Sequence, residues 1–312
     1  MNLQDLQSNY GISAKKITVL RSNVAIIESD ENIRYIIKRI RISNTNKWID
    51  KHRFQNELRI YKQLNEKQFK ILNSPKLYAN SDQHMVIQFV EKDPNLRTKS
   101  YEFVRAYCEM QTIDVPKDFG FDFKNQLVRG FLYRGLVIPL FTLSKHLKAL
   151  SILKMVLLYL KLELSVKKLT NRYWLHGDLT NQNVYHNLQD GKLYFLDFEN
   201  LFYTRKWPLI EIIQKCIWLK DGGYGFVIDL KKLKYYLDIV KDYNRQDLTH
   251  INMQKQFRFA LLMTSINSIA IAKSKIKRES FIQLLNILID TKAYHTWFSK
   301  FIKPELLKNK II

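Results

Sequence analysis

Several residues that define whole protein classes are scarce in this 312-residue sequence. It holds only two cysteines, Cys108 and Cys216, which lie far apart and belong to no C-x-x-C pair. This count excludes a disulfide scaffold, and we predict two buried free thiols in the reducing cytoplasm. Glycine (9) and proline (6) are also few, whereas 46% of the residues are hydrophobic. This composition excludes a disordered chain and predicts a folded, helix-rich protein with room for about two domains.

Long apolar runs are missing as well. The first residues, MNLQDLQSNYGISAKKITVL, hold no basic segment followed by an apolar one, so no signal peptide is expected. The most apolar segments, residues 150–164 and 257–272, contain charged or polar side chains and fall short of the ~20 clean apolar residues of a membrane-spanning helix. We predict that both are core helices of a cytoplasmic protein.

Acidic residues are outnumbered by basic ones. The sequence has 51 Lys and Arg against 29 Asp and Glu, a formal net charge of +22. This balance is informative about partners and not about fold, and it suits an anionic substrate, nucleic acid or an anionic membrane surface. A solvated basic surface with no specific partner explains the charge equally well.

The first third of the chain predicts a small α+β lobe. Residues 17–42 form two strand-like runs on either side of the turn residues SDEN, and residues 48–67 have helical spacing of their apolar side chains. Two further strand-like runs, PKLYANSD and HMVIQFVE, follow. With a hairpin in the first run, the predicted order is three strands, a helix and two strands. We place a lobe over residues 1–91 and a linker at EKDPNLRTKS, after which residues 92–312 form a second lobe.

The second lobe is predicted to be mainly helical. Helical patterns cover residues 144–170, 208–220, 229–243, 255–273 and 279–302. Two short strands, NVYHN and KLYFLDF, interrupt them, with a hairpin turn at QDG.

This hairpin lies inside the most distinctive stretch, LHGDLTNQNVYHNLQDGKLYFLDFEN. A hairpin returns both of its ends to the same side, so Asp178 and Asn183 before it are expected to lie near Asp197 after it. Two carboxylates and an amide oxygen suit a hard cation such as Mg²⁺, which is often shared with phosphate. Each residue alone is explained by turn capping, but the set at this spacing predicts a metal–phosphate site.

The same stretch resembles the catalytic and metal motifs of the aminoglycoside-phosphotransferase and choline-kinase branch of the protein-kinase-like fold. HGD-x-x-x-x-N matches residues 176–183, and D-x-E matches residues 197–199, where protein kinases have DFG. The resemblance extends over about residues 17–220. It implies a bilobal α+β fold, with a β-rich nucleotide-binding lobe and a larger helical lobe.

The resemblance also implies a role for each residue of the stretch. Asp178 would accept or orient the proton of the attacking hydroxyl, while Asn183 and Asp197 would hold Mg²⁺ on the phosphates of ATP. His176 would be a scaffold residue that hydrogen-bonds backbone near the Asp197 turn. Glu199 would serve a second metal ion or face the substrate.

A kinase-like site further needs a lysine on the third strand and a helix carboxylate that holds it. Lys38 in RYIIKRI and Glu57 in FQNELRIYKQL stand at the matching places. Arg39 and Glu66 are the weaker substitutes for this pair.

Other parts of the nucleotide site follow from the resemblance alone. The chain has no G-x-G-x-x-G, and Ser22 and Asn23 in LRSNVAII would form the phosphate loop instead. Adenine would lie near the end of the fifth strand, at Gln88, Phe89 and Val90. Glu211 in WPLIEII would steady the catalytic loop, at a place where family members often have Asp.

These motifs describe the donor half of a kinase site and leave the acceptor open. The basic charge favours an anionic small molecule, such as a sugar or surface-glycan precursor, over a polycationic drug, and it allows contact with the inner membrane surface; nucleic acid is not expected as a partner. A protein kinase or autophosphorylating regulator is an alternative, although the chain lacks the Gly-rich loop, the A-P-E segment and the DFG glycine. A second alternative is an inactive kinase-like module that binds an anionic membrane or nucleic acid. The choice between ATP and GTP stays open.

Overall fold

The computed structural model describes residues 10–40, 47–96, 100–113, 131–170, 172–180, 182–219, 226–244, 251–309 and 311. The chain divides into two compact units. The first unit combines residues 1–113 with residues 178–201, and the second combines residues 114–177 with residues 202–312. The first unit thus includes the segment that carries the acidic motif, and the lobe boundary near residue 91 stays a prediction.

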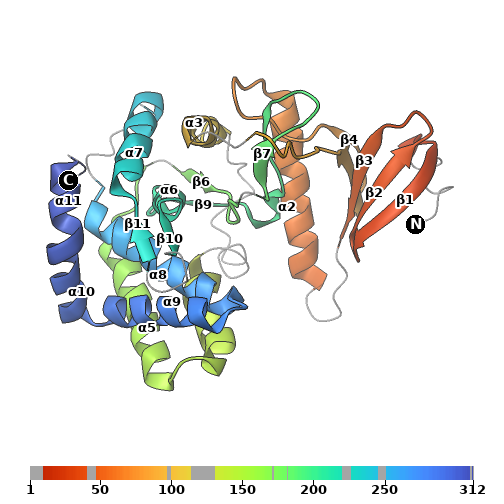
Figure 1. Ribbon diagram of the computed structural model, residues 1–312. Coiled ribbons are helices and arrows are strands. Elements are labelled where there is room, and N and C mark those ends of the chain that lie inside the picture. The colour runs from red at the N-terminus through yellow and green to blue at the C-terminus, as the bar shows by residue number, and fades with distance from the viewer. Residues whose placement is uncertain are drawn as a thin grey trace. The chain divides into compact units, whose positions relative to one another are not determined.

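The first unit contains a five-stranded antiparallel sheet (Figure 1). Its strands lie in the order β1-β2-β3-β5-β4. The elements are β1 (Ala14–Arg21), β2 (Val24–Ser29), β3 (Arg34–Arg39), helix α2 (Lys47–Glu66), β4 (Leu77–Asn80) and β5 (His84–Gln88). This order confirms the predicted three strands, helix and two strands.

The sheet is held by apolar side chains that alternate along its strands. Ile27, Ile37 and Val86, one from each of three neighbouring strands, form a buried cluster. Since successive strand residues point to opposite faces, burying Ile37 turns the next residue, Lys38, to the other face. The fold therefore presents Lys38 away from this cluster.

Besides the sheet and α2, the first unit contains a short hairpin, a further helix and a 3₁₀ turn. These elements are helix α3 (Ser100–Met110), strands β7 (Val184–His186) and β8 (Leu193–Phe195), and the 3₁₀ turn η4 (Phe198–Asn200). The predicted hairpin is confirmed, and Gly191 in its turn adopts a positive φ of 65° that glycine tolerates without strain. Phe195 stacks on Phe103 of α3 with ring centroids 6.1 Å apart, so this helix backs the hairpin.

The second unit is mainly helical in the part that is described (Figure 1). Its strands are β6 (Tyr173–Leu175) paired with β9 (Phe202–Thr204), and β10 (Ile217–Leu219) paired with β11 (Phe226–Ile228). The helices are η2 (Tyr133–Thr142), η3 (Leu143–Lys145), α5 (Ala149–Ser165), α6 (Ile210–Gln214), α7 (Leu230–Asn244), α8 (Met253–Ile271), α9 (Lys275–Ile289), α10 (Thr291–Trp297), η7 (Phe298–Ile302) and α11 (Lys303–Lys308). In the core of this unit, Trp207 stacks on Phe259 with ring centroids 3.8 Å apart.

Two predicted helices of this unit are wrong in extent. The helix expected over residues 208–220 ends at Gln214, because residues 217–219 pair as a strand with residues 226–228. The helix expected over residues 279–302 is interrupted at Asp290, whose side chain accepts a hydrogen bond from the amide of Ala293 and so begins a new helix.

Helix α5 also departs from its prediction as a core helix. One face is buried, through Ile152, Met155, Leu158, Tyr159 and Leu162. The opposite face is exposed and carries leucines at 150, 153, 157, 160 and 164. None of the helices in the described part of the chain has the length and apolar character needed to cross a bilayer.

Candidate active site

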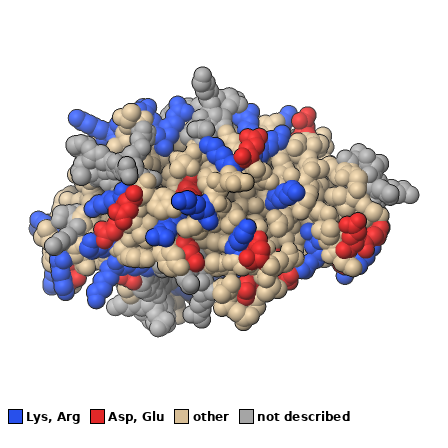
Figure 2. Space-filling model, turned by 90° about the horizontal axis from the view of Figure 1, so that it is seen from above, with Lys and Arg blue, Asp and Glu red and all other residues tan. Residues whose placement is uncertain are grey.

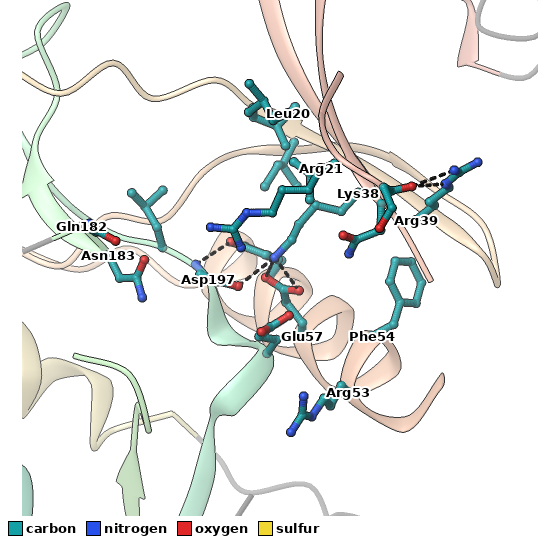
Figure 3. A pocket seen from close by; sticks show the side chains of 18 of the residues that line it. Leu20, Arg21, Lys38, Arg39, Arg53, Phe54, Glu57, Gln182, Asn183 and Asp197 are labelled. Carbon is teal, nitrogen blue, oxygen red and sulfur yellow. Dashed lines mark hydrogen bonds and ion pairs between the residues drawn. The ribbon is translucent and has the colours of Figure 1, made fainter. Parts of the chain in front are cut away.

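Lys38 is the centre of a buried charge cluster in the first unit (Figure 3). Its Nζ donates to Oε1 and Oε2 of Glu57 at 2.7 and 2.9 Å, and to Oδ1 of Asp197 at 2.8 Å. The side chain of Lys38 is 12% exposed and that of Glu57 is 3% exposed. The strand lysine and the helix carboxylate predicted as a pair are thus in contact.

Burial and charge act against each other in this cluster. Burial disfavours the charged form of Lys38, but the carboxylates of Glu57 and Asp197 outweigh it and raise the lysine pKa well above its ordinary value. Burial raises the pKa of Glu57 to about 7, although the Lys38 ammonium opposes this shift. Glu57, Asp197 and Glu199 each offer a carboxylate oxygen, and these atoms lie within 4.8 Å of one another. One ammonium therefore faces three acids, and the donor set suits an added hard cation.

Asp197 has an unusual backbone conformation. Its φ and ψ are 60° and 65°, in the left-handed region that Asp tolerates better than most residues. Its amide donates to the hydroxyl of Tyr61 at 3.3 Å, and Tyr61 packs edge-on against Phe198. The helix α2 and the turn after β8 together fix the conformation that turns this carboxylate towards Lys38.

The loop before the hairpin supplies the second half of the cluster. Nδ2 of Asn183 donates to the backbone oxygen of Asp178 at 2.9 Å and to its Oδ2 at 3.1 Å. Since the amino group is used in this way, Oδ1 of Asn183 is the atom left for a cation. The amide of Leu196 donates to the carbonyl of Asn183 at 2.8 Å, so the two ends of the hairpin lie together, as the sequence predicted.

A pocket of about 550 Å³ opens beside these residues (Figure 3). The predicted residues that line it are Ser22, Asn23, Lys38, Arg39, Glu57, Asn183, Asp197 and Glu199. Asp178 and the predicted adenine segment, Gln88, Phe89 and Val90, are not among its lining residues, although Ile87 is.

The proposed substitutes for the lysine–glutamate pair have other positions. Arg39 donates through Nε and Nη2 to the carbonyl of Ser22 at 3.0 and 2.7 Å, so it anchors the β1–β2 turn. Glu66 is the last residue of α2 and is exposed. Lys38 and Glu57 are therefore the pair that the fold brings together.

Sequence reasoning missed several residues of the pocket, among them Arg21, Arg53 and Tyr185. The hydroxyl of Tyr185 donates to the carbonyl of Val90 at 3.1 Å and links β7 to the end of β5. Arg53 lies one helical turn before Glu57 on α2, and this spacing was the one signal that could have identified it.

Two predicted residues lie in the second unit. Glu211, at the start of α6, is buried. Its carboxylate accepts hydrogen bonds from the backbone amides of His176 at 2.9 Å and of Gly177 at 2.7 Å. Burial raises the pKa of Glu211, and these two hydrogen bonds oppose the shift. Arg134, which sequence reasoning missed, donates to the carbonyl of Gly177. His176 is fully buried, and its predicted scaffold role stays a prediction.

The basic residues do not gather at one place on the face of the molecule in Figure 2. Lys and Arg side chains are spread over that face, with Asp and Glu between them. This face has the character of a solvated basic surface and not of a nucleic-acid track.

Comparisons with known proteins were made by sequence and by structure. The sequence matches no protein-family model and no curated protein. Among solved structures, a protein assigned as a fructosamine-3-kinase from Haemophilus somnus 129PT is 15% identical, with a TM-score of 0.61 over 92% of this chain and 96% of that one. The streptomycin–ATP ternary complex of APH(2″)-IIa is 16% identical, with a TM-score of 0.56 over 93% and 95%.

The AMP-bound spectinomycin phosphotransferase APH(9)-Ia is 14% identical, with a TM-score of 0.55 over 93% and 98%. At these identities the likeness establishes the fold. The chain has the protein-kinase-like α+β fold of these structures over nearly its whole length, and the expected fold class is confirmed.

Proposed function

We propose that this chain, which has the fold of those phosphotransferases, is an ATP- and magnesium-dependent enzyme that transfers a terminal phosphoryl group to a hydroxyl of a small molecule. The observation that carries the proposal is Lys38, held between Glu57 and Asp197 at the wall of a pocket of about 550 Å³. Small-molecule sites span roughly 300–1,000 Å³, so the pocket has the volume for a nucleotide. The solved neighbours that were crystallised with ATP or AMP support the same choice of ligand.

The charge cluster has the chemistry of the donor half of such a site. Lys38 would bind the nucleotide phosphates, and Glu57 would hold the lysine in place. Mg²⁺ would be held by Asp197 and Oδ1 of Asn183, with Glu199 as a further carboxylate near them. When bound, this ion neutralises charge on the phosphates of the nucleotide.

Asp178 is the residue proposed for the acceptor hydroxyl. Its Oδ2 accepts a hydrogen bond from Asn183, which orients the carboxylate and leaves its other oxygen for the incoming proton. Glu211 holds the two backbone amides directly before Asp178 in the chain, those of His176 and Gly177. Catalysis in this class depends on positioning and electrostatics, which is what these hydrogen bonds supply.

The remaining contacts to the nucleotide are proposed from the resemblance. Ser22 and Asn23 would face the phosphates, from a turn that Arg39 fixes through the Ser22 carbonyl. The adenine base of the nucleotide would lie near residues 88–90, where the Tyr185 hydroxyl donates a hydrogen bond to the Val90 carbonyl. GTP is the alternative donor.

For the acceptor we propose an anionic sugar or surface-glycan precursor. The net charge of +22 disfavours a polycationic acceptor through general repulsion. A kinase with a cationic acceptor is thus the less favoured choice, even though the APH(2″)-IIa neighbour was solved with streptomycin. An acceptor screen that reads ADP release from Mg-ATP tests this, and turnover of aminoglycosides without turnover of any sugar would contradict it.

The reaction itself is tested by Asp178→Ala and Asp197→Ala. Each variant is expected to lose several orders of magnitude in phosphoryl transfer, because one removes the proton acceptor and the other a phosphate-side ligand. Asp82→Asn, at an exposed position, is the matched control and is expected to keep full activity. Retained turnover in either alanine variant would contradict the proposed function. So would the absence of a thermal shift of the wild type with Mg-ATP, Mg-ADP and Mg-GTP.

A further inference from the structure

Helix α5 of the second unit carries an apolar face that the phosphotransferase site does not use. Its leucines are 39–85% exposed, although leucine is among the residues most often found inside proteins. They are Leu150 (62%), Leu153 (55%), Leu157 (55%), Leu160 (39%) and Leu164 (85%). Scattered single leucines need no explanation, but five on one helix do.

The spacing of these leucines makes them one continuous stripe. Successive members are three or four residues apart, so they fall on the same side of a helix with 3.6 residues per turn. Fifteen residues rise by about 21 Å, which gives the length of the stripe. The other side of α5, with Met155 and Leu162, is already buried in the unit. The stripe is therefore a second apolar face, directed away from the core.

The sequence around the stripe is basic. Between residues 141 and 170 there are six lysines and one acid. Lys154 and Lys161 fall along one edge of the stripe, and the other lysines lie before and after the helix, at 145, 148, 167 and 168. All six are exposed. The single acid, Glu163, is bound by Lys206 and by Nε1 of Trp207 and does not offset this charge at the stripe.

We propose that this leucine stripe docks the protein on an anionic lipid bilayer. Apolar side chains enter the boundary between headgroups and acyl chains, and the flanking lysines remain at the level of the anionic headgroups. The charge decides against a second copy of this chain as the occupant, since two bodies of +22 each repel, whereas an anionic surface attracts both the lysines and the whole molecule. The proposal is independent of the nucleotide site, and it describes a helix that lies on the membrane.

Vesicle co-sedimentation of the full chain tests this surface. The wild type is expected to bind vesicles of phosphatidylcholine mixed with phosphatidylglycerol, to bind phosphatidylcholine alone weakly, and to release as salt is raised. Leu153→Ser/Leu157→Ser is expected to weaken binding about tenfold or more, because two exposed leucines that would enter the bilayer are lost from the contact. Lys154→Glu/Lys161→Glu is expected to weaken the preference for the anionic lipid.

The matched control is Leu307→Ser, which removes a leucine of similar exposure (53%) from α11 and is expected to bind like the wild type. All three variants change exposed residues and are expected to unfold at the wild-type temperature. The proposal is overturned if the wild type ignores the anionic vesicles at low salt, or if the double serine variant binds as tightly as the wild type. It is also overturned if sedimentation velocity finds a dimer that this variant dissociates while vesicle binding is absent.

Discussion

Single residues of the charge cluster have unequal tasks. Lys38 contacts two carboxylates, but only Glu57 is almost fully buried, while Asp197 is 30% exposed and faces the pocket. Glu57 thus holds Lys38 in place, and Asp197 also lies where a ligand in the pocket would contact it. Breaking a buried pair leaves an uncompensated charge, which makes Glu57 the more sensitive partner.

Glu57→Gln is therefore expected to lower kcat/KM for the nucleotide by about tenfold to a hundredfold, or about 1.4–2.7 kcal/mol. The lysine then keeps only Asp197 and moves from its position on the phosphates. Steady-state kinetics with varied Mg-ATP measures the effect. Glu66→Gln, at the exposed end of the same helix, is the control, and equal losses in both variants would refute the assignment of the pair.

Both cysteines are predicted to be unreactive in the folded chain. Burial raises the pKa of the Cys108 thiol and of the Cys216 thiol to about 12, and only the thiolate is a nucleophile. Labelling with a thiol reagent at mildly alkaline pH should leave both unmodified until denaturant is added. Since the unfolded thiols ionise from their ordinary value of 9.0, each contributes stability below that pH and loses it as the pH rises towards 12. Rapid labelling of the native protein contradicts the burial.

At the scale of elements, local patterns predicted most of the fold. The strand alternation around Ile27 and Ile37 and the helical spacing around Phe54 and Tyr61 both agree with the observed elements. Helical spacing gave the wrong extent for the helix predicted over residues 279–302, because the side chain of Asp290 caps a new helix within it. Periodicity also cannot tell which apolar face of a helix is covered, which is why the outer face of α5 was assigned to the core.

The proximity of the two hairpin ends was predictable for a different reason. Asp178 and Asn183 precede the hairpin and Asp197 follows it, so short-range geometry brings the two ends of the hairpin together. Arg21 lines the pocket from the end of β1, and Tyr185 lines it from β7, where its hydroxyl donates to the Val90 carbonyl. No local sequence motif identifies either residue as part of the pocket. The roles of all these residues stay predictions until kinetics test them.

The contact between η2 and α5 leaves no room for a larger residue at Gly135. A Cβ placed there would lie 2.4 Å from a ring carbon of Tyr159, which is itself buried. Gly135→Ala is expected to destabilise the protein by about 1–3 kcal/mol, because the ring has to move in a packed core. Chemical denaturation measures this. Leu140→Ala, at an exposed position of the same helix, should change the midpoint little, and an unchanged midpoint in the glycine variant would show that the ring is free to shift.

At the scale of the whole molecule, the two compact units carry different parts of the proposed activity. Every residue that lines the pocket belongs to the first unit, and Glu211 and the α5 stripe belong to the second. Within a molecule of net charge +22, three acids cluster around Lys38, while Arg21, Arg39 and Arg53 also line the pocket. The Mg²⁺ ion of a metal–nucleotide complex is expected to offset these carboxylates, and its phosphates suit the lining cations.

Nucleotide binding should therefore protect the two units unequally from hydrogen exchange. Mg-ATP contacts are proposed at the β1–β2 turn, at β3, at α2 and around Asp197, all within the first unit. A ligand that binds only the folded state stabilises it, and at a concentration 100 times its dissociation constant the gain is about 2.7 kcal/mol. We expect exchange to slow in peptides that cover residues 20–39, 53–61 and 195–199. Helices α7 to α10 should change less, because no contact is proposed there. Uniform protection of both units would mean that they unfold as one, and protection confined to the second unit would contradict the pocket as the nucleotide site.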